Sequence, residues 1–181
     1  MSHQVYAFEP PERFVAGTVG EPGERTFFLQ ARGGGRLISV VLEKVQVSLL
    51  AEKLEELLAE AHRRFGVELP EPPGSTDDND PLELPLDEEF RVGTLGLAWA
   101  GDTQTVVIEA IAVGEYEAEE PTEAELAELD RLRVRLTPDA TRAFISRARR
   151  VVSAGRPPCP FCGQPLDPRG HLCPRHNGYR R

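Results

Sequence analysis

The sequence predicts an α+β protein in which helices pack on a sheet, followed by a short metal-binding tail. Short β-rich runs separated by glycine and proline turns alternate with long amphipathic stretches. The same order of elements, three strands and then a helix, occurs twice along the chain. All three cysteines lie near the C-terminus, from Cys159 onward. These observations favour a sheet-and-helix sandwich with a zinc knuckle at its end.

The first half begins with three runs rich in β-branched and aromatic residues, at 14–19, 26–31 and 37–42. Turn sequences separate them, so we expect an antiparallel meander. A helix follows, because apolar residues recur at steps of three and four. Its apolar stripe consists of Val47, Leu50, Leu54, Leu57, Leu58, Ala61 and Phe65. Gly66 favours the left-handed conformation that commonly ends a helix.

Residues 67–89 are rich in proline and acidic side chains and predict a long loop. A loop of this length in a compact domain is either mobile or functional. The cluster of aspartates lacks the ligand spacing and the distal glutamate of a calcium loop. We therefore expect a solvated linker between the two halves.

The second half predicts strands at 90–99, 105–113 and 132–136. Thr122 and Glu125 form a capping box, which indicates a short acidic helix before the last strand. Thr137 followed by Pro138 is a typical start for a second long helix, which ends near Gly155. Its inward face is expected to hold Phe144, Ile145, Ala148, Val151 and Val152.

The two halves also begin alike, with FVAGTVG at 14–20 and FRVGTLG at 90–96. Four of the seven positions are identical. The prediction is therefore one α+β domain, residues 1–155, built from two β-β-β-α halves at about 14–66 and 90–155. Residues 156–181 form a separate tail. The shared glycines are expected at strand bends or close backbone approaches.

Charge is divided unevenly along a chain whose net charge is −9. Residues 130–181 hold 12 arginines and three acidic residues, whereas residues 1–129 hold nine basic and 27 acidic residues. Opposite charges of this kind favour attraction within one molecule, and they also allow a basic face for an anionic partner.

The sequence contains no apolar run long enough to span a membrane, and its start lacks the pattern of a signal peptide. An odd number of cysteines is unusual for a secreted disulfide framework. We therefore expect a cytoplasmic protein with reduced thiols.

The tail carries the clearest chemical motif. Cys159 and Cys162 are spaced C-x-x-C, which can direct two thiolates at one ion. Cys173 supplies a third thiolate, and either His171 or His176 supplies an imidazole. Three thiolates and one imidazole form a closed tetrahedral zinc site, which is structural because no position is left for a substrate. Zinc would also stabilise a tail that has few apolar residues of its own.

The ending CPFCGQPLDPRGHLCPRHNGYRR resembles the ending CPxCGxPLDPxGHxCPRxNGYRR of an actinobacterial family of unknown function, described as a "repeat protein". FFLQARGGG and VVIEA are similar as well, so the resemblance covers nearly the whole chain. The resemblance implies an intracellular protein and favours His171 as the fourth ligand. The symmetry of the two C-P-x-[CH] segments keeps His176 as the alternative.

Three functions remain open at this level. The favoured one is a non-catalytic adaptor or assembly protein that binds a protein partner through Arg175, Tyr179, Arg180 and Arg181, since interfaces favour arginine and tyrosine. A second is an enzyme with a site between the halves, for which Glu43, Glu109 and Glu115 lie near strand ends, although the common catalytic motifs are absent. A third is a nucleic-acid binder that uses the C-terminal arginines.

Overall fold

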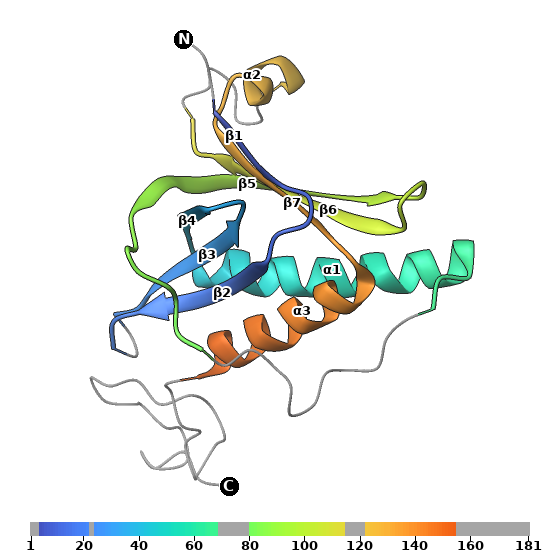
Figure 1. The fold of residues 1–181 in the computed structure, drawn as a ribbon, viewed down its shortest axis with the longest axis horizontal. Coiled ribbons are helices and arrows are strands. Elements are labelled where there is room, and N and C mark those ends of the chain that lie inside the picture. The colour runs from blue at the N-terminus through green and yellow to red at the C-terminus, as the bar shows by residue number, and fades with distance from the viewer. Residues whose placement is uncertain (1–3, 22–23, 69–79, 115–121, 155–181) are drawn as a thin grey trace, which may run out of the picture.

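The computed structural model describes residues 4–21, 24–68, 80–114 and 122–154, which form a mixed sheet with two long helices on one face (Figure 1). The strands described are β1 (Val5–Phe8), β2 (Arg13–Val19), β3 (Thr26–Gly33), β4 (Arg36–Leu42), β5 (Glu88–Ala100), β6 (Thr105–Ala112) and β7 (Arg131–Leu136). The helices described are α1 (Lys44–Phe65), α2 (Glu123–Ala127) and α3 (Pro138–Ser153).

The sheet has the strand order β1-β7-β6-β5-β4-β3-β2. Strands β2, β3 and β4 form one antiparallel meander, and β5, β6 and β7 form another. The two meanders meet where β4 pairs with β5 in parallel. The predicted α+β class is confirmed. The element order β-β-β-α recurs with α2 inserted before β7, and the internal duplication stays a prediction.

Strand β1 was not expected from the sequence. It pairs in parallel with β7 at one edge of the sheet, with Val5 opposite Arg131 and Phe8 opposite Val134. Four residues are too few to establish a period, and two prolines follow soon after Phe8. Its partner strand lies more than a hundred residues away in the chain, so no local sequence pattern predicts the pairing.

Helix α1 follows its predicted stripe closely. Glu43 and Gln46 form a reciprocal capping box at its start, and Gly66 ends it with a φ of 66°. The buried side chains are Val47, Leu50, Ala51, Leu54, Leu58 and Ala61. Phe65 was expected in the stripe but is 62% exposed, because it lies in the last turn, at the end of the helix.

Helix α3 begins as predicted, with Thr137 Oγ1 accepting a hydrogen bond of 3.1 Å from the Ala140 amide. Its apolar face packs on β2, where the rings of Phe144 and Phe14 stack with centroids 4.7 Å apart. Arg147 is buried and donates from Nε to the Ala16 carbonyl of β2 at 2.8 Å. Helix α3 thereby covers the backbone of an edge strand, which would otherwise be free to pair with another chain.

The hydrophobic core lies between the sheet and the two helices. Alternate residues of each strand face it, among them Leu29 of β3, Val40 of β4, Ile108 of β6 and Val134 of β7, all almost completely buried. The glycine expectation is confirmed at Gly93, where an added Cβ would lie 2.8 Å from the Val113 Cα. The backbone of the chain after β6 therefore approaches β5 closely.

Replacing Ile145 with aspartate is expected to unfold the protein. Ile145 is 3% exposed in the core, and burying an unpaired carboxylate costs several kcal/mol, comparable to the stability of a small domain. Thermal unfolding followed by circular dichroism measures the effect. The matched control is Ala143→Asp, at an exposed position of the same helix. Equal melting temperatures for the two variants would contradict this packing.

Candidate functional site

The most elaborate polar arrangement in the described residues lies on the sheet face opposite the helices. There, residues 80–85 (DPLELP) lie over β2 and β3 and bend at Leu84 and Pro85. We call the surface beneath them the β2–β3 groove; it consists of Arg13 and Gly17 of β2, Gln30 and Arg32 of β3, and Ser39 of β4. Residues 80–85 are called the 80–85 segment. The expectation of a solvated linker is therefore wrong for this part of the loop.

The backbone of Glu83 is held by a single buried side chain. Gln30 is 1% exposed, and its Oε1 accepts a hydrogen bond of 2.8 Å from the Glu83 amide. Its Nε2 donates to the Glu83 carbonyl at 3.0 Å and to Ser39 Oγ at 3.1 Å. A buried amide left without partners costs about 1–3 kcal/mol. The 80–85 segment thus supplies hydrogen bonds that the sheet requires.

Two arginines hold the carboxylate of Glu83. Arg32 Nη1 lies 2.7 Å from one oxygen, and Arg13 Nη1 lies 3.5 Å from the other. Arg13 Nη2 also donates to the carbonyls of Asp80 and Pro81, at 2.9 and 3.2 Å. Arg32 and Glu83 remain 42% and 33% exposed. An ion pair as accessible as that of Arg32 contributes about 0–1 kcal/mol, so it provides selectivity more than stability. The Arg13 side chain is only 10% exposed.

Leu82 fills a hollow that only glycine leaves open. An added Cβ on Gly17 would lie 2.5 Å from the Leu82 Cδ2. The group that approaches Gly17 is a side chain, whereas the sequence predicted a strand bend or a close backbone approach. Next to the segment, a cavity of about 430 Å³ is lined by Glu12, Arg13, Arg32 and residues 80–83. The segment therefore does not fill the space between the two arginines.

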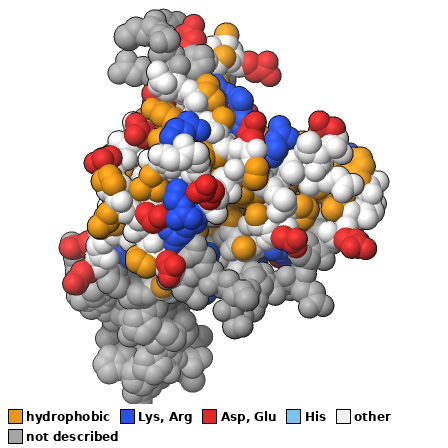
Figure 2. All heavy atoms as spheres, in the orientation of Figure 1, with side chains coloured by type: hydrophobic (Ala, Val, Ile, Leu, Met, Phe, Trp, Pro, Cys, Tyr) orange, Lys and Arg blue, Asp and Glu red, His pale blue; other side chains and the backbone are white. Residues whose placement is uncertain are grey.

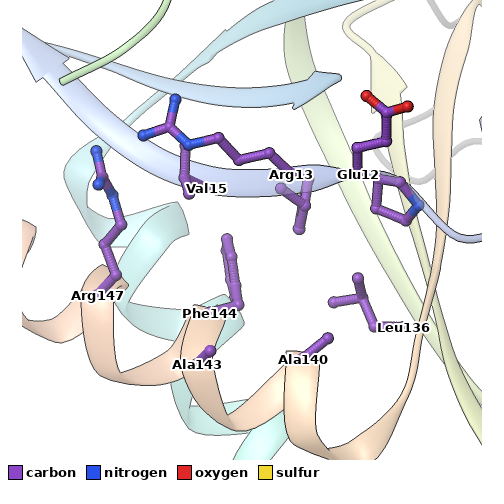
Figure 3. A pocket seen from close by; sticks show the side chains of 10 residues that line it. Glu12, Arg13, Val15, Leu136, Ala140, Ala143, Phe144 and Arg147 are labelled. Carbon is purple, nitrogen blue, oxygen red and sulfur yellow. The ribbon is translucent and has the colours of Figure 1, made fainter. Parts of the chain in front are cut away.

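A second, smaller cavity of about 180 Å³ lies between β2 and α3 (Figure 3). Arg147 and Phe144 rise toward β2 from α3, and Leu136 and Glu12 line the other end. Arg13 borders this cavity as well as the larger one. One arginine thus connects the groove with the contact between β2 and α3.

Arginines of the basic C-terminal part are held by contacts within the body. Glu55 of α1 pairs with Arg142 and Arg149 of α3. Glu109 of β6 lies 2.9 Å from Arg131 and 3.7 Å from Arg133. On the face shown in Figure 2, basic and acidic side chains lie next to one another. For the described residues this agrees with attraction within the molecule.

The groups considered for catalysis have structural partners where they are described. Glu43 caps α1 and pairs with Arg91 at 2.7 Å. His62 lies in the last turn of α1, and its Nδ1 is 2.8 Å from the Val67 carbonyl just after the helix. Burial and the neighbouring Glu89 carboxylate raise the pKa of Tyr6, whose hydroxyl donates to Glu89 at 3.2 Å. Glu115 lies outside the described residues.

A family model for proteins of unknown function, DUF3090, matches residues 6–173. The chain belongs to the DUF3090 family. No curated protein and no solved structure matches it. The DUF3090 match takes in the three cysteines and His171 and ends before His176. The actinobacterial origin inferred from the resemblance stays a prediction.

The predicted zinc and contact residues all lie outside the described part of the chain. They are Cys159, Cys162, His171, Cys173, Arg175, His176, Tyr179, Arg180 and Arg181. Within the described ranges, no three His, Cys, Asp or Glu side chains are grouped so that they could hold a metal ion. No helix in those ranges is both long and apolar enough to cross a membrane.

The groove itself was missed at the level of sequence, although two residues signal it. Gln30 interrupts an otherwise apolar strand, TFFLQA, and a buried polar residue in such a place requires a partner. Gly17 occupies the centre of another buried strand. Neither residue indicates which segment of the chain it serves.

Replacing Glu55 with glutamine is expected to destabilise the protein slightly at pH 7 and not at pH 3. Hydrogen bonding from Arg149 lowers the pKa of the Glu55 carboxyl below its ordinary value. A lowered pKa in the folded state stabilises it above the ordinary glutamate pKa of about 4.3, and this is lost as the pH falls through the folded-state value. Since Glu55 is partly exposed, the effect is below about 1 kcal/mol.

Chemical unfolding of the unchanged protein and the variant at both pH values measures this difference. Glu52→Gln, at an exposed position of the same helix, is the matched control and should change little at either pH. A Glu55→Gln effect of the same size at pH 3 would contradict a role for the ionised carboxylate.

Proposed function

We propose that this protein is an intracellular adaptor that binds other protein chains and does not catalyse a reaction. The observation that carries the proposal is the way in which the β2–β3 groove holds the 80–85 segment. Gln30 forms hydrogen bonds with the backbone of Glu83, and Arg13 and Arg32 pair with the Glu83 carboxylate. The side chain of Leu82 packs against Gly17. Binding modules recognise extended peptides by this combination of backbone hydrogen bonds and side-chain pockets.

The proposal includes a structural zinc ion in the C-terminal tail, bound by Cys159, Cys162, Cys173 and His171, with His176 as the alternative fourth ligand. Support comes from ligand type and spacing, because C-x-x-C followed by a further cysteine and two histidines is typical of zinc knuckles. The ion would order a segment rich in proline, glycine and arginine. Ordering such a segment is useful to a cytoplasmic adaptor if its surface contacts a partner.

The proposed contact group in the tail is Arg175, Tyr179, Arg180 and Arg181. Arg142, Arg147 and Arg149 of α3 are already held by Glu55 or by the Ala16 carbonyl, so binding a partner through them would break contacts of the fold. This argument also counts against a nucleic-acid interface centred on α3, and leaves the tail arginines as the better candidates.

Purified protein is expected to contain about one zinc per chain, measured by elemental analysis, because three thiolates and an imidazole complete one tetrahedral site. Replacing Cys159 and Cys162 together with serine should remove the metal. His171→Ala and His176→Ala, compared side by side, identify the fourth ligand. Folded protein without metal and with three freely titrating thiols would refute the site.

Charge reversal of Arg180 and Arg181 to glutamate is expected to abolish capture of a stoichiometric protein partner from the native host, while zinc content and melting temperature stay unchanged. Capture by the unchanged protein should weaken with added salt, since exposed charges are screened. Glu123→Lys with Glu128→Lys, a charge change at two exposed positions on and just after α2, is the control.

Other outcomes of this experiment are equally informative. Capture that survives the reversal, or a reversal that lowers only the melting temperature, would assign the arginines to an internal clamp. RNA as the only stoichiometric companion would favour the nucleic-acid function instead. If the purified protein captures neither a protein partner nor RNA, the adaptor role is contradicted.

A further inference from the structure

We propose that the β2–β3 groove is a binding site for an extended acidic segment of a partner protein, and that the 80–85 segment is its resident occupant within the chain. This inference rests on the adaptor role proposed above and specifies the chemistry of the partner. The partner segment presents a leucine-like side chain followed directly by a carboxylate.

The backbone contacts of the groove suit any extended chain. Within the 80–85 segment, Gln30 bonds only to the amide and carbonyl of Glu83, groups that every residue except proline provides. Arg13 likewise donates to two backbone carbonyls. Because Gln30 is buried in the sheet, it requires such a chain at all times. The groove thus selects for an extended segment at this place, whichever molecule supplies it.

The side-chain contacts supply the selectivity. The hollow above Gly17 admits a branched apolar side chain such as Leu82. Arg32 and Arg13 lie on either side of the next carboxylate, at 2.7 and 3.5 Å. Two arginines around one carboxylate favour an acidic residue there, because they repel a basic side chain and lose their charge-assisted hydrogen bonds to a neutral one. A leucine followed by an acidic residue is therefore the expected recognition element.

Several features distinguish the 80–85 segment from a permanent part of the core. Leu84 is 82% exposed, and Leu82 is the one leucine of the segment that the sheet covers. The contact of Arg32 with the carboxylate remains partly open to solvent, and a cavity of about 430 Å³ is lined by the segment and both arginines. By contrast, α1 and α3 are held by stripes of fully buried side chains. An incoming segment of the same chemistry replaces each contact that the resident segment loses.

The experiment uses the hexapeptide Asp-Pro-Leu-Glu-Leu-Pro, labelled with a fluorophore, and full-length protein. In one variant, Leu82→Ala and Glu83→Ala together remove the side-chain anchors of the resident segment. The peptide is expected to bind this variant at least tenfold more tightly than the unchanged protein, measured by fluorescence anisotropy. A peptide with glutamine in place of glutamate, or alanine in place of the first leucine, should bind at least tenfold more weakly.

Gly17→Ala added to this variant is expected to abolish peptide binding, because its Cβ occupies the space of the leucine. The clash involves only the flexible end of a side chain, so the sheet itself can accept alanine. Gly96→Ala is the matched control, since an added Cβ there meets only the Glu109 Cβ at 3.9 Å. Peptide binding that survives Gly17→Ala would place the peptide elsewhere and overturn the proposal.

A second measurement avoids variants that alter stability. In the unchanged protein, excess peptide should accelerate hydrogen exchange of the Glu83 amide, whose bond to Gln30 is lost when the resident segment leaves. Amides of β3 and β4 should keep their protection. No peptide binding to the variant together with unchanged exchange at Glu83 would show that the segment is a fixed part of the fold. Doubling of the molecular mass in the variant or the unchanged protein, with no peptide bound, would assign the groove to a second copy of the chain.

These outcomes separate this inference from the adaptor proposal. If the peptide does not bind but a partner is still captured through the tail, the proposal for the groove is wrong and the adaptor proposal stands. Peptide binding with no captured protein from the native host would contradict the tail contact group and leave the groove standing.

Discussion

The parallel pairing of β4 with β5 is the constraint from which the rest of the arrangement follows. Antiparallel neighbours can be joined by tight turns, whereas a parallel pair needs a long connection that returns the chain to the same end of the sheet. Residues 43–87 provide it. Within this connection α1 covers the helix face of the sheet, and the 80–85 segment covers the opposite face over β2 and β3. The first meander is therefore enclosed by two parts of one crossover, α1 and the 80–85 segment, together with α3, which packs on β2.

The two faces of the sheet are covered differently, by a helix on one and by the 80–85 segment on the other, because their side chains differ. On the helix face, alternate residues such as Leu29 and Val40 are apolar and are packed against α1 and α3. On the opposite face the same strands present Gln30, Ser39 and Arg32, so a covering chain must supply backbone hydrogen bonds and a carboxylate. Apolar packing is lost at a high cost in free energy, whereas the partly exposed contact of Arg32 with Glu83 exchanges with a competitor or with water at a much lower one. The buried Gln30 needs a competitor that replaces its hydrogen bonds. The face that is suited to exchange is thus the polar one.

Local sequence patterns predict most of the helices and strands, but they predict little of how these pair and pack. The stripe of α1, the caps of both long helices and six of the described strands are predictable because period, capping residues and turn residues act over a few positions. Strand β1 is not, since a four-residue strand has no period and its partner is β7. The proline-rich acidic composition of residues 67–89 predicts a loop, and residues 80–87 lie in neither a helix nor a strand. The composition cannot show that Glu83 meets Gln30. That contact depends on which strands become neighbours, and only the fold determines it.

A resident segment changes what a partner needs in order to bind. A segment in the same chain competes at an effective concentration that reaches the millimolar range, so a partner of merely equal intrinsic affinity is excluded at cellular concentrations. The observed affinity is the intrinsic one multiplied by the small fraction of molecules whose groove is open. A partner overcomes this by binding at a second place on the same molecule, which raises its own effective concentration at the groove. In the proposed adaptor the arginines of the tail are that second place, and an acidic partner that engages both gains from each contact. Acidic peptides that contact only the groove then bind weakly, whereas a partner with two correctly spaced acidic surfaces binds tightly.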